Sequence, residues 1–247
     1  MRPWRRHRAH MVDVALMADF RIAVFASHTG TNLRALHRAS LEEGAAFRLA
    51  LVLSNNRESG ALAYARGHSI PAAHMSGVTH PDPDQLDTAI CALLNEHQIS
   101  LIVTAGYMKK IGPRTLDSFA GQIINVHPSL LPRHGGKGMY GSAVHEAVLS
   151  SGDQVTGPSV HVVTADYDEG PVIARHEIAV HPNDSVESLA ERVLTAEHVL
   201  LPAVVQDLAV RAIERQDRIA LPANSGRAQA ARSSPSRGSE SSPSSSR

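Results

Sequence analysis

Asn125 and His127 have the residue types and the spacing that acyl-transfer chemistry requires. They open the run Asn125-Val-His-Pro-Ser-Leu-Leu-Pro132. In an extended segment, side chains two residues apart point to the same face, so the amide and the imidazole project together. An amide donor stabilises a developing oxyanion, and an imidazole moves a proton near neutral pH. The alternative interpretation is a structural histidine, since the chain has 15 histidines and most histidines are simply hydrogen-bonded.

An acidic loop offers a partner for this imidazole. It is the run Asp166-Tyr-Asp-Glu-Gly-Pro171. A carboxylate such as Asp168 close to His127 would favour the imidazolium and raise its pKa. His161 adds another polar side chain that could face inward. Asp and Gly-Pro are also common turn residues, so the loop is equally compatible with a plain connection.

The turn Ser27-His-Thr-Gly-Thr-Asn32 leads directly into a helical pattern, which suits phosphate binding. Gly30 lets the backbone approach a ligand closely, while Thr31 and Asn32 can donate hydrogen bonds or cap the helix. The helix N-terminus supplies oriented N–H groups for an anion. The turn has neither G-x-G-x-x-G nor a P-loop lysine, which favours a single phosphate over a dinucleotide. A plain capping turn is the alternative.

Two other kinds of site are not expected. The run His176-Glu-Ile-Ala-Val-His181 resembles a zinc helix, but its second histidine is one residue too far for H-E-x-x-H and the segment has a strand pattern. Cys91 is the single cysteine, so we expect no multi-cysteine metal site and no internal disulfide. G-x-S-x-G is absent, which leaves a serine hydrolase without support.

Strands that alternate with helices must position these residues. We expect strands at 21–26, 49–53, 70–74, 99–104, 122–126, 159–164 and 172–180, and helices around 31–41, 61–65, 84–97 and from 185 onward. This order predicts an α/β fold with an open, mostly parallel sheet, helices on both faces and an irregular C-terminal part. Ligands of such sheets bind outside the carboxyl ends of the strands, where the three polar segments lie.

Composition limits the class of protein. The 24 basic and 24 acidic residues balance, which argues against binding nucleic acid or anionic lipid through bulk charge. The sequence contains no run of about 18 consecutive apolar residues, so we expect no membrane-spanning helix. We expect one domain at 20–221, a flexible Arg-rich extension at 1–19, and a disordered Ser/Pro/Arg-rich tail at 222–247. Without a convincing export signal, we expect a cytoplasmic protein.

Together the motifs resemble one enzyme family. Gly30-Thr-Asn-Leu33, Ala105-Gly-Tyr-Met-Lys-Lys110, Asn125–Pro132 and Asp168-Glu-Gly-Pro-Val172 are similar to the phosphoribosylglycinamide formyltransferases, folate-dependent enzymes of purine synthesis. The resemblance covers roughly 21–208. It implies a Rossmann-like formyltransferase fold and transfer of the formyl group of 10-formyltetrahydrofolate, the co-substrate, to the amine of 5′-phosphoribosylglycinamide, with no metal.

The resemblance also implies a role for each matching residue. Its catalytic residues would be Asn125, His127 and Asp168. The residues that hold the phosphorylated substrate would be Gly30, Thr31, Asn32 and Glu197. The folate would contact Met108, Lys109, Lys110, Ile111 and Asn125, whereas Pro83 stands where the family often has a basic residue near the folate.

Three alternatives remain at this point. A related formyltransferase could act on another amine, that of methionyl-tRNA or a sugar nucleotide, although such relatives usually carry a further C-terminal domain. A formyltetrahydrofolate hydrolase shares the catalytic motif but normally has an N-terminal regulatory domain. The third alternative is a non-catalytic module that binds a phosphate ligand. On the favoured reading the partners are small molecules, with no nucleic acid or membrane, and the protein is a monomer or a homodimer.

Overall fold

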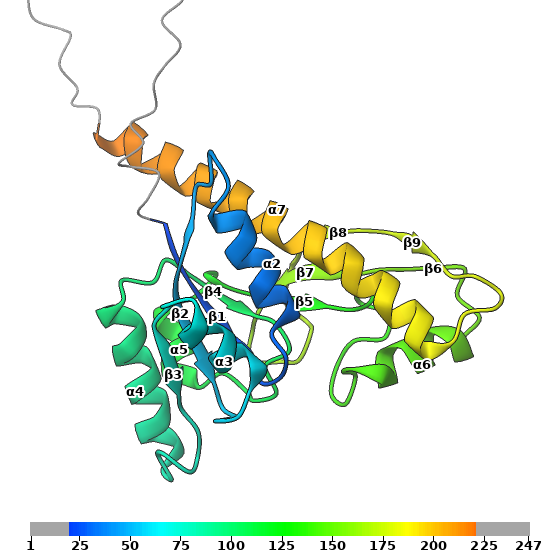
Figure 1. Ribbon diagram of the computed structural model, residues 1–247, viewed down its shortest axis with the longest axis horizontal. Coiled ribbons are helices and arrows are strands. Elements are labelled where there is room, and N and C mark those ends of the chain that lie inside the picture. The colour runs from blue at the N-terminus through cyan, green and yellow to red at the C-terminus, as the bar shows by residue number, and fades with distance from the viewer. Residues whose placement is uncertain (1–19, 221–247) are drawn as a thin grey trace, which may run out of the picture.

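The structure is a computed structural model that describes residues 20–220. The predicted extension at 1–19 and the predicted tail at 222–247 lie outside the described residues. Within residues 20–220, seven strands form one sheet in the order β3-β2-β1-β4-β5-β7-β8 (Figure 1). They are β1 (Arg21–Phe25), β2 (Arg48–Ser54), β3 (Ala72–His74), β4 (Leu101–Thr104), β5 (Ile123–His127), β7 (Ser159–Val162) and β8 (Val172–Arg175).

The sheet is parallel from β3 to β5 and antiparallel at one side, where β7 pairs with β5 and β8 pairs with β7. This confirms the predicted mostly parallel α/β fold. The helices are α2 (Thr31–Ser40), α3 (Gly60–Gly67), α4 (Pro83–Glu96), α5 (Pro113–Ser118), α6 (Ser142–Ser150) and α7 (Val186–Ala220).

Two apolar cores lie on the two faces of the sheet. On one face, Leu33 of α2 and Leu201 of α7 belong to the same buried cluster as Val24 of β1. On the other face, Leu94 of α4 clusters with Phe25, the next residue of β1. Successive strand residues point to opposite faces, so a sheet that is covered on both sides needs a continuous apolar run. The apolar pattern of β1 therefore has a direct structural cause.

The C-terminal helix α7 holds this arrangement together. In Figure 1 it runs diagonally across the sheet beside α2. By length and composition alone, 186–215 could cross a membrane. However, Leu189, Val193 and Leu201 are completely buried within the protein. We therefore interpret α7 as a core helix.

The structure corrects several boundaries. Leu41, predicted to lie on the apolar side of its helix, is 72% exposed because α2 ends at Ser40. The strand predicted over 172–180 divides into β8 and β9 (Ile178–Ala179). The short strand β9 leaves the main sheet and pairs with β6 (Val155–Thr156). Neither β6 nor the helices α5 and α6 were expected from the sequence.

The carboxyl ends of the parallel strands bring distant turns together. The turn after β1 is joined to the turn after β4, where the Ser27 N–H donates to the Gly106 carbonyl at 3.0 Å. The Ser27 hydroxyl also accepts from the Met108 N–H at 2.8 Å. The predicted phosphate-binding turn and the predicted folate segment are therefore neighbours at the same edge of the sheet.

Candidate active site

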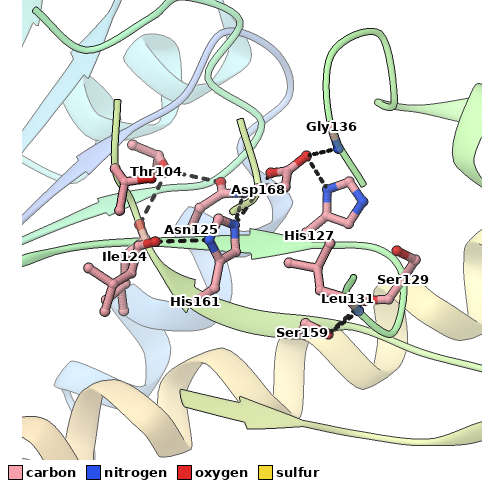
Figure 2. Close-up of polar contacts among 12 residues, drawn as sticks. Thr104, Ile124, Asn125, His127, Ser129, Leu131, Gly136, Ser159, His161 and Asp168 are labelled. Carbon is pink, nitrogen blue, oxygen red and sulfur yellow. Dashed lines mark hydrogen bonds and ion pairs between the residues drawn. The ribbon is translucent and has the colours of Figure 1, made fainter. Parts of the chain in front are cut away.

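The pairing of β5 with β7 sets the positions of the central polar residues. Asn125 lies directly opposite His161 in this antiparallel pair, and His127 lies opposite Ser159. Asn125 and His127 are two residues apart in the strand, so their side chains share a face, as the sequence predicted. Figure 2 shows these side chains with Asp168 between the two imidazoles.

Asn125 is held from two sides. The Thr104 hydroxyl, at the end of the neighbouring strand β4, donates to Asn125 Oδ1 at 2.9 Å. On the other side, Asn125 Nδ2 lies 3.1 Å from His161 Nε2. His161 Nδ1 lies 3.0 Å from the Val162 carbonyl, which can only accept, so Nδ1 carries the hydrogen of the neutral ring. Asn125 Nδ2 therefore donates one hydrogen to His161 and has a second one to offer.

A backbone carbonyl also orients His127. Its Nε2 lies 2.8 Å from the carbonyl of His134, so this nitrogen carries a hydrogen and donates it. The other ring nitrogen, Nδ1, faces Asp168 Oδ2 at 3.5 Å. Neutral His127 consequently holds a lone pair on Nδ1, and this is the ring atom that can take up a proton.

Asp168 joins the two imidazoles. Its Oδ1 lies 3.4 Å from His161 Nε2, and its Oδ2 accepts from the Gly136 N–H at 2.9 Å (Figure 2). Burial acts to raise the pKa of Asp168, but His161 beside its Oδ1, the charge of His127 and the Gly136 N–H together hold it below its usual value. Asp168 is therefore an ionised carboxylate at neutral pH.

The protonation of His127 differs from the expectation. Its side chain is 4% exposed, and burial lowers its pKa below the ordinary value. Asp168 raises the pKa, as predicted, but by less than burial lowers it. His161 and His134 also lower the pKa of His127. Burial, and then the charge of His127, lower the pKa of the nearby His145. In the resting protein at neutral pH, His127 is therefore mainly neutral and is ready to accept a proton.

The predicted phosphate-binding turn also comes together with its distant partner. Gly30, at φ 72°, begins α2 in a left-handed conformation and provides no side-chain cap, so the first N–H groups of the helix are not capped by that residue. Asn32 Nδ2 donates to Glu197 Oε2 of α7 at 2.6 Å. Asn32 Oδ1 is buried and has no hydrogen-bond partner among the described residues. It is an acceptor available to a substrate, and Thr31, the first residue of α2, lies in the same turn.

Glu197 is a buried carboxyl group at this turn. Burial raises its pKa to about 7, although the hydrogen bond from Asn32 acts in the opposite direction. Near neutral pH it is therefore present in both protonated and ionised forms. Within residues 20–220, no hydrogen bond or ion pair joins Asn32 or Glu197 to Asn125, His127 or Asp168. The structure thus brings the predicted residues together in two groups at one edge of the sheet.

The predicted folate segment lies beside the acidic loop. Its members Met108, Lys109 and Lys110 are exposed, and Ile111 is half-buried. The Lys110 ammonium lies 5.3 Å from the centre of the Tyr167 ring, next to Asp168 in the chain. This contact places the segment against the loop that carries the carboxylate. A ligand that lies along 108–111 is therefore beside the Asp168 loop.

The sequence offered weaker signals for the supporting residues. Thr104 is the last residue of its strand and pairs with Asn125 across β4 and β5, so a polar strand end was the available signal. His161 was recognised only as a polar residue that could face inward. His134, whose carbonyl receives the His127 hydrogen, gave no signal, because any residue carries a carbonyl.

Comparison with known protein families identifies the family to which this chain belongs. The model of the family described as formyl transferase matches residues 20–205. The chain belongs to the formyl transferase family. Formyl-folate is the co-substrate that this family uses. The matched region contains every residue of both groups, from the turn after β1 to Glu197 in α7.

Several relatives within the family share the name of one enzyme. The chain is 35% identical over 203 residues to the chloroplastic phosphoribosylglycinamide formyltransferase of Arabidopsis thaliana, covering 81% of this chain and 70% of the relative. It is 37% identical over 196 residues to the phosphoribosylglycinamide formyltransferase of Mycobacterium tuberculosis, covering 79% and 88%. The crystal structure of glycinamide ribonucleotide transformylase 1 from Symbiobacterium toebii superposes with a TM-score of 0.72 at 34% identity, covering 78% and 88%.

Proposed function

We propose that this protein transfers the formyl group of 10-formyltetrahydrofolate to the amine of 5′-phosphoribosylglycinamide, a step of purine synthesis. The observation that carries the proposal is the convergence of Asn125, His127 and Asp168 from β5 and the acidic loop, on a chain that belongs to the formyl transferase family. The relatives named for this reaction support the choice of the amine.

The catalytic step follows from the groups present. The substrate amine attacks the formyl carbon, a C–N bond forms, and the carbonyl oxygen becomes an oxyanion. The free hydrogen of Asn125 Nδ2 donates to that oxyanion. The bond from the formyl carbon to the folate nitrogen then breaks.

Proton balance gives His127 its role. The attacking amine must lose one proton, and the departing folate nitrogen must gain one. Neutral His127 accepts the first at Nδ1 and, as the imidazolium, supplies the second. Asp168, ionised and 3.5 Å from Nδ1, stabilises the imidazolium while it exists. A lowered resting pKa is therefore compatible with catalysis, because the charge on His127 is transient.

The two substrates would occupy the two ends of the same edge. Gly30, Thr31 and the buried Asn32–Glu197 pair would hold the phosphorylated nucleotide at the start of α2. Met108, Lys109, Lys110 and Ile111 would line the folate, next to the Asp168 loop. In this arrangement the amine and the formyl group meet at Asn125 and His127.

One assay tests the proposal against its alternatives. Purified protein is supplied with 10-formyltetrahydrofolate and, in separate reactions, phosphoribosylglycinamide, methionyl-tRNA, an amino-sugar nucleotide or no acceptor. We expect formylated product in the reaction with phosphoribosylglycinamide and in none of the other reactions. Turnover only with another amine, formate release without an acceptor, or phosphate-ligand binding without any turnover would each refute the assignment.

The setting of the reaction is part of the same proposal. The balanced charge of 24 basic and 24 acidic residues favours small-molecule substrates over nucleic acid or a membrane surface. A cytoplasmic location and a monomeric or homodimeric state remain predictions, since the plant relative carries a chloroplastic name.

A further inference from the structure

The turn that follows β5 is anchored from outside the catalytic cluster. Its residue His134 supplies the carbonyl that accepts the His127 Nε2 hydrogen at 2.8 Å. The side chain of the same residue points to a different partner, because His134 Nε2 lies 2.7 Å from Asp153 Oδ2. Asp153 follows α6 and is 10% exposed. One residue thus touches the catalytic imidazole through its backbone and a half-buried carboxylate through its side chain.

The conformation of His134 needs such an anchor. It has φ 54°, a left-handed conformation that costs a non-glycine residue on the order of 1 kcal/mol. Relaxation to the ordinary conformation would rotate its carbonyl away from His127 Nε2. The Ser129 hydroxyl donates to the Arg133 carbonyl at 2.6 Å and so fixes the preceding residue, but its distance to the His134 carbonyl is 3.4 Å.

Packing around the turn is incomplete on one side. A hollow of about 360 Å³ lies against the turn and is lined by Leu130, Arg133, His134 and Asp153, among others. Side chains that line a hollow lack packing contacts on that side, so the turn has room to move there. The Ser151 hydroxyl lies 3.5 Å from His134 Nε2, so the 2.7 Å bond to Asp153 is the shorter of the two polar contacts that restrain this side chain.

We propose that His134 and Asp153 are positioning residues for catalysis, which hold the 134 carbonyl against His127 Nε2 and thereby keep His127 Nδ1 free to carry the proton. This inference rests on the proposed function for its catalytic meaning. Its structural part, the control of the His127 imidazole, is independent of any substrate.

The link has a defined effect on the catalytic ring. The carbonyl that accepts from Nε2 favours the charged imidazole and raises the pKa of His127. It also fixes the hydrogen of the neutral ring on Nε2. Loss of the anchor should therefore lower the pKa of His127 further and mix its two neutral forms. The binding turn at α2 does not depend on this contact, so substrate binding should change little.

The experiment compares four variants. His134→Ala and His134→Gly both remove the side-chain bond, but glycine adopts the left-handed conformation without strain. Asp153→Ala removes the partner. Arg133→Ala is the matched control, because Arg133 contacts the other oxygen of Asp153 through an exposed side chain.

Two readouts are measured on each folded variant. NMR titration gives the pKa and the neutral form of His127 without substrate, and steady-state kinetics give kcat and KM. We expect His134→Ala, His134→Gly and Asp153→Ala to lower the His127 pKa and to reduce kcat roughly 10- to 100-fold with KM nearly unchanged. Arg133→Ala should stay within about twofold of the wild type.

Several results would overturn the inference. An unchanged His127 pKa in both His134→Ala and Asp153→Ala shows that the anchor does not act on the imidazole. Wild-type behaviour of both His134→Gly and Asp153→Ala beside a defective His134→Ala shows that backbone strain, and not the side-chain bond, is responsible. If Asp153→Ala does not fold, Asp153→Asn takes its place. Asparagine keeps the shape and an acceptor oxygen, so we expect the His127 pKa in this variant to stay close to the wild-type value. Because NMR needs no substrate, failure of the proposed function leaves this test valid.

Discussion

Asp168 acts on His127 through charge, and its effect can be measured on a single residue. In Asp168→Asn the side-chain oxygen can still accept a hydrogen bond from the Gly136 N–H, but the negative charge 3.5 Å from His127 Nδ1 is lost. Since that charge raises the pKa of His127 against the effect of burial, we expect a lower pKa in the variant. NMR titration of the His127 ring checks this. A pKa equal to that of the wild type would show that the two groups are not coupled.

Glu197 gives a prediction about stability. Its carboxyl pKa rises from 4.5 to about 7 on folding, so the folded protein holds the proton more tightly than the unfolded chain. Stability from this group therefore falls as pH rises between about 4.5 and 7, by roughly 3 kcal/mol in all. Glu197→Gln keeps an acceptor for Asn32 and does not titrate. We expect its stability relative to the wild type to be higher at pH 8 than at pH 5.

Urea unfolding of both proteins at the two pH values measures this difference. Glu214→Gln, an exposed glutamate on the same helix, is the control and should show no such dependence. The same stability difference between Glu197→Gln and the wild type at both pH values would show that the carboxyl group is ionised throughout this range.

At the scale of the elements, α4 holds the start of α5 just after the predicted folate segment. Asp87 of α4 is buried and accepts from the Arg114 N–H, the Thr115 N–H and the Thr115 hydroxyl. Gly112 lies at the N-cap of α5 and has no side chain to do this. We expect Asp87→Ala to lower the free energy of unfolding by about 2–3 kcal/mol, because three donors lose a charged acceptor.

Denaturant unfolding checks the Asp87 prediction. Asp117→Ala changes an exposed aspartate of the same helix α5 and should alter the free energy of unfolding by less than about 0.5 kcal/mol. Equal effects of the two substitutions would mean that the Asp87 contacts do not stabilise α5.

The elements also show where sequence patterns are informative. β1 and β2 are buried on both faces, so their continuous apolar runs are distinctive. The two residues of β6 are too few to show a period. The predicted strand over 172–180 is interrupted where Gly157 passes the His176 backbone, and a Cβ on Gly157 would lie 1.8 Å from the His176 carbonyl oxygen. That crossing depends on tertiary structure and leaves no local pattern.

At the scale of the whole molecule, the topology of the sheet explains how the site is assembled. Parallel strands have their carboxyl ends at one edge, so turns distant in sequence meet there, and the fold class alone predicts that the Gly30 turn and Asn125 share an edge. The contact of Asn125 with His161 depends on the register of an antiparallel pair. The neutral state of His127 depends on burial by many residues. Neither can be obtained from residue types and spacing.

Turnover of Asn125→Ala and His127→Ala tests the central claim most directly, with phosphoribosylglycinamide and 10-formyltetrahydrofolate at saturating concentrations. We predict that each variant folds and loses on the order of 100- to 1,000-fold in kcat, because each lacks a group that acts in the transition state. Turnover close to that of the wild type in both variants would contradict the account.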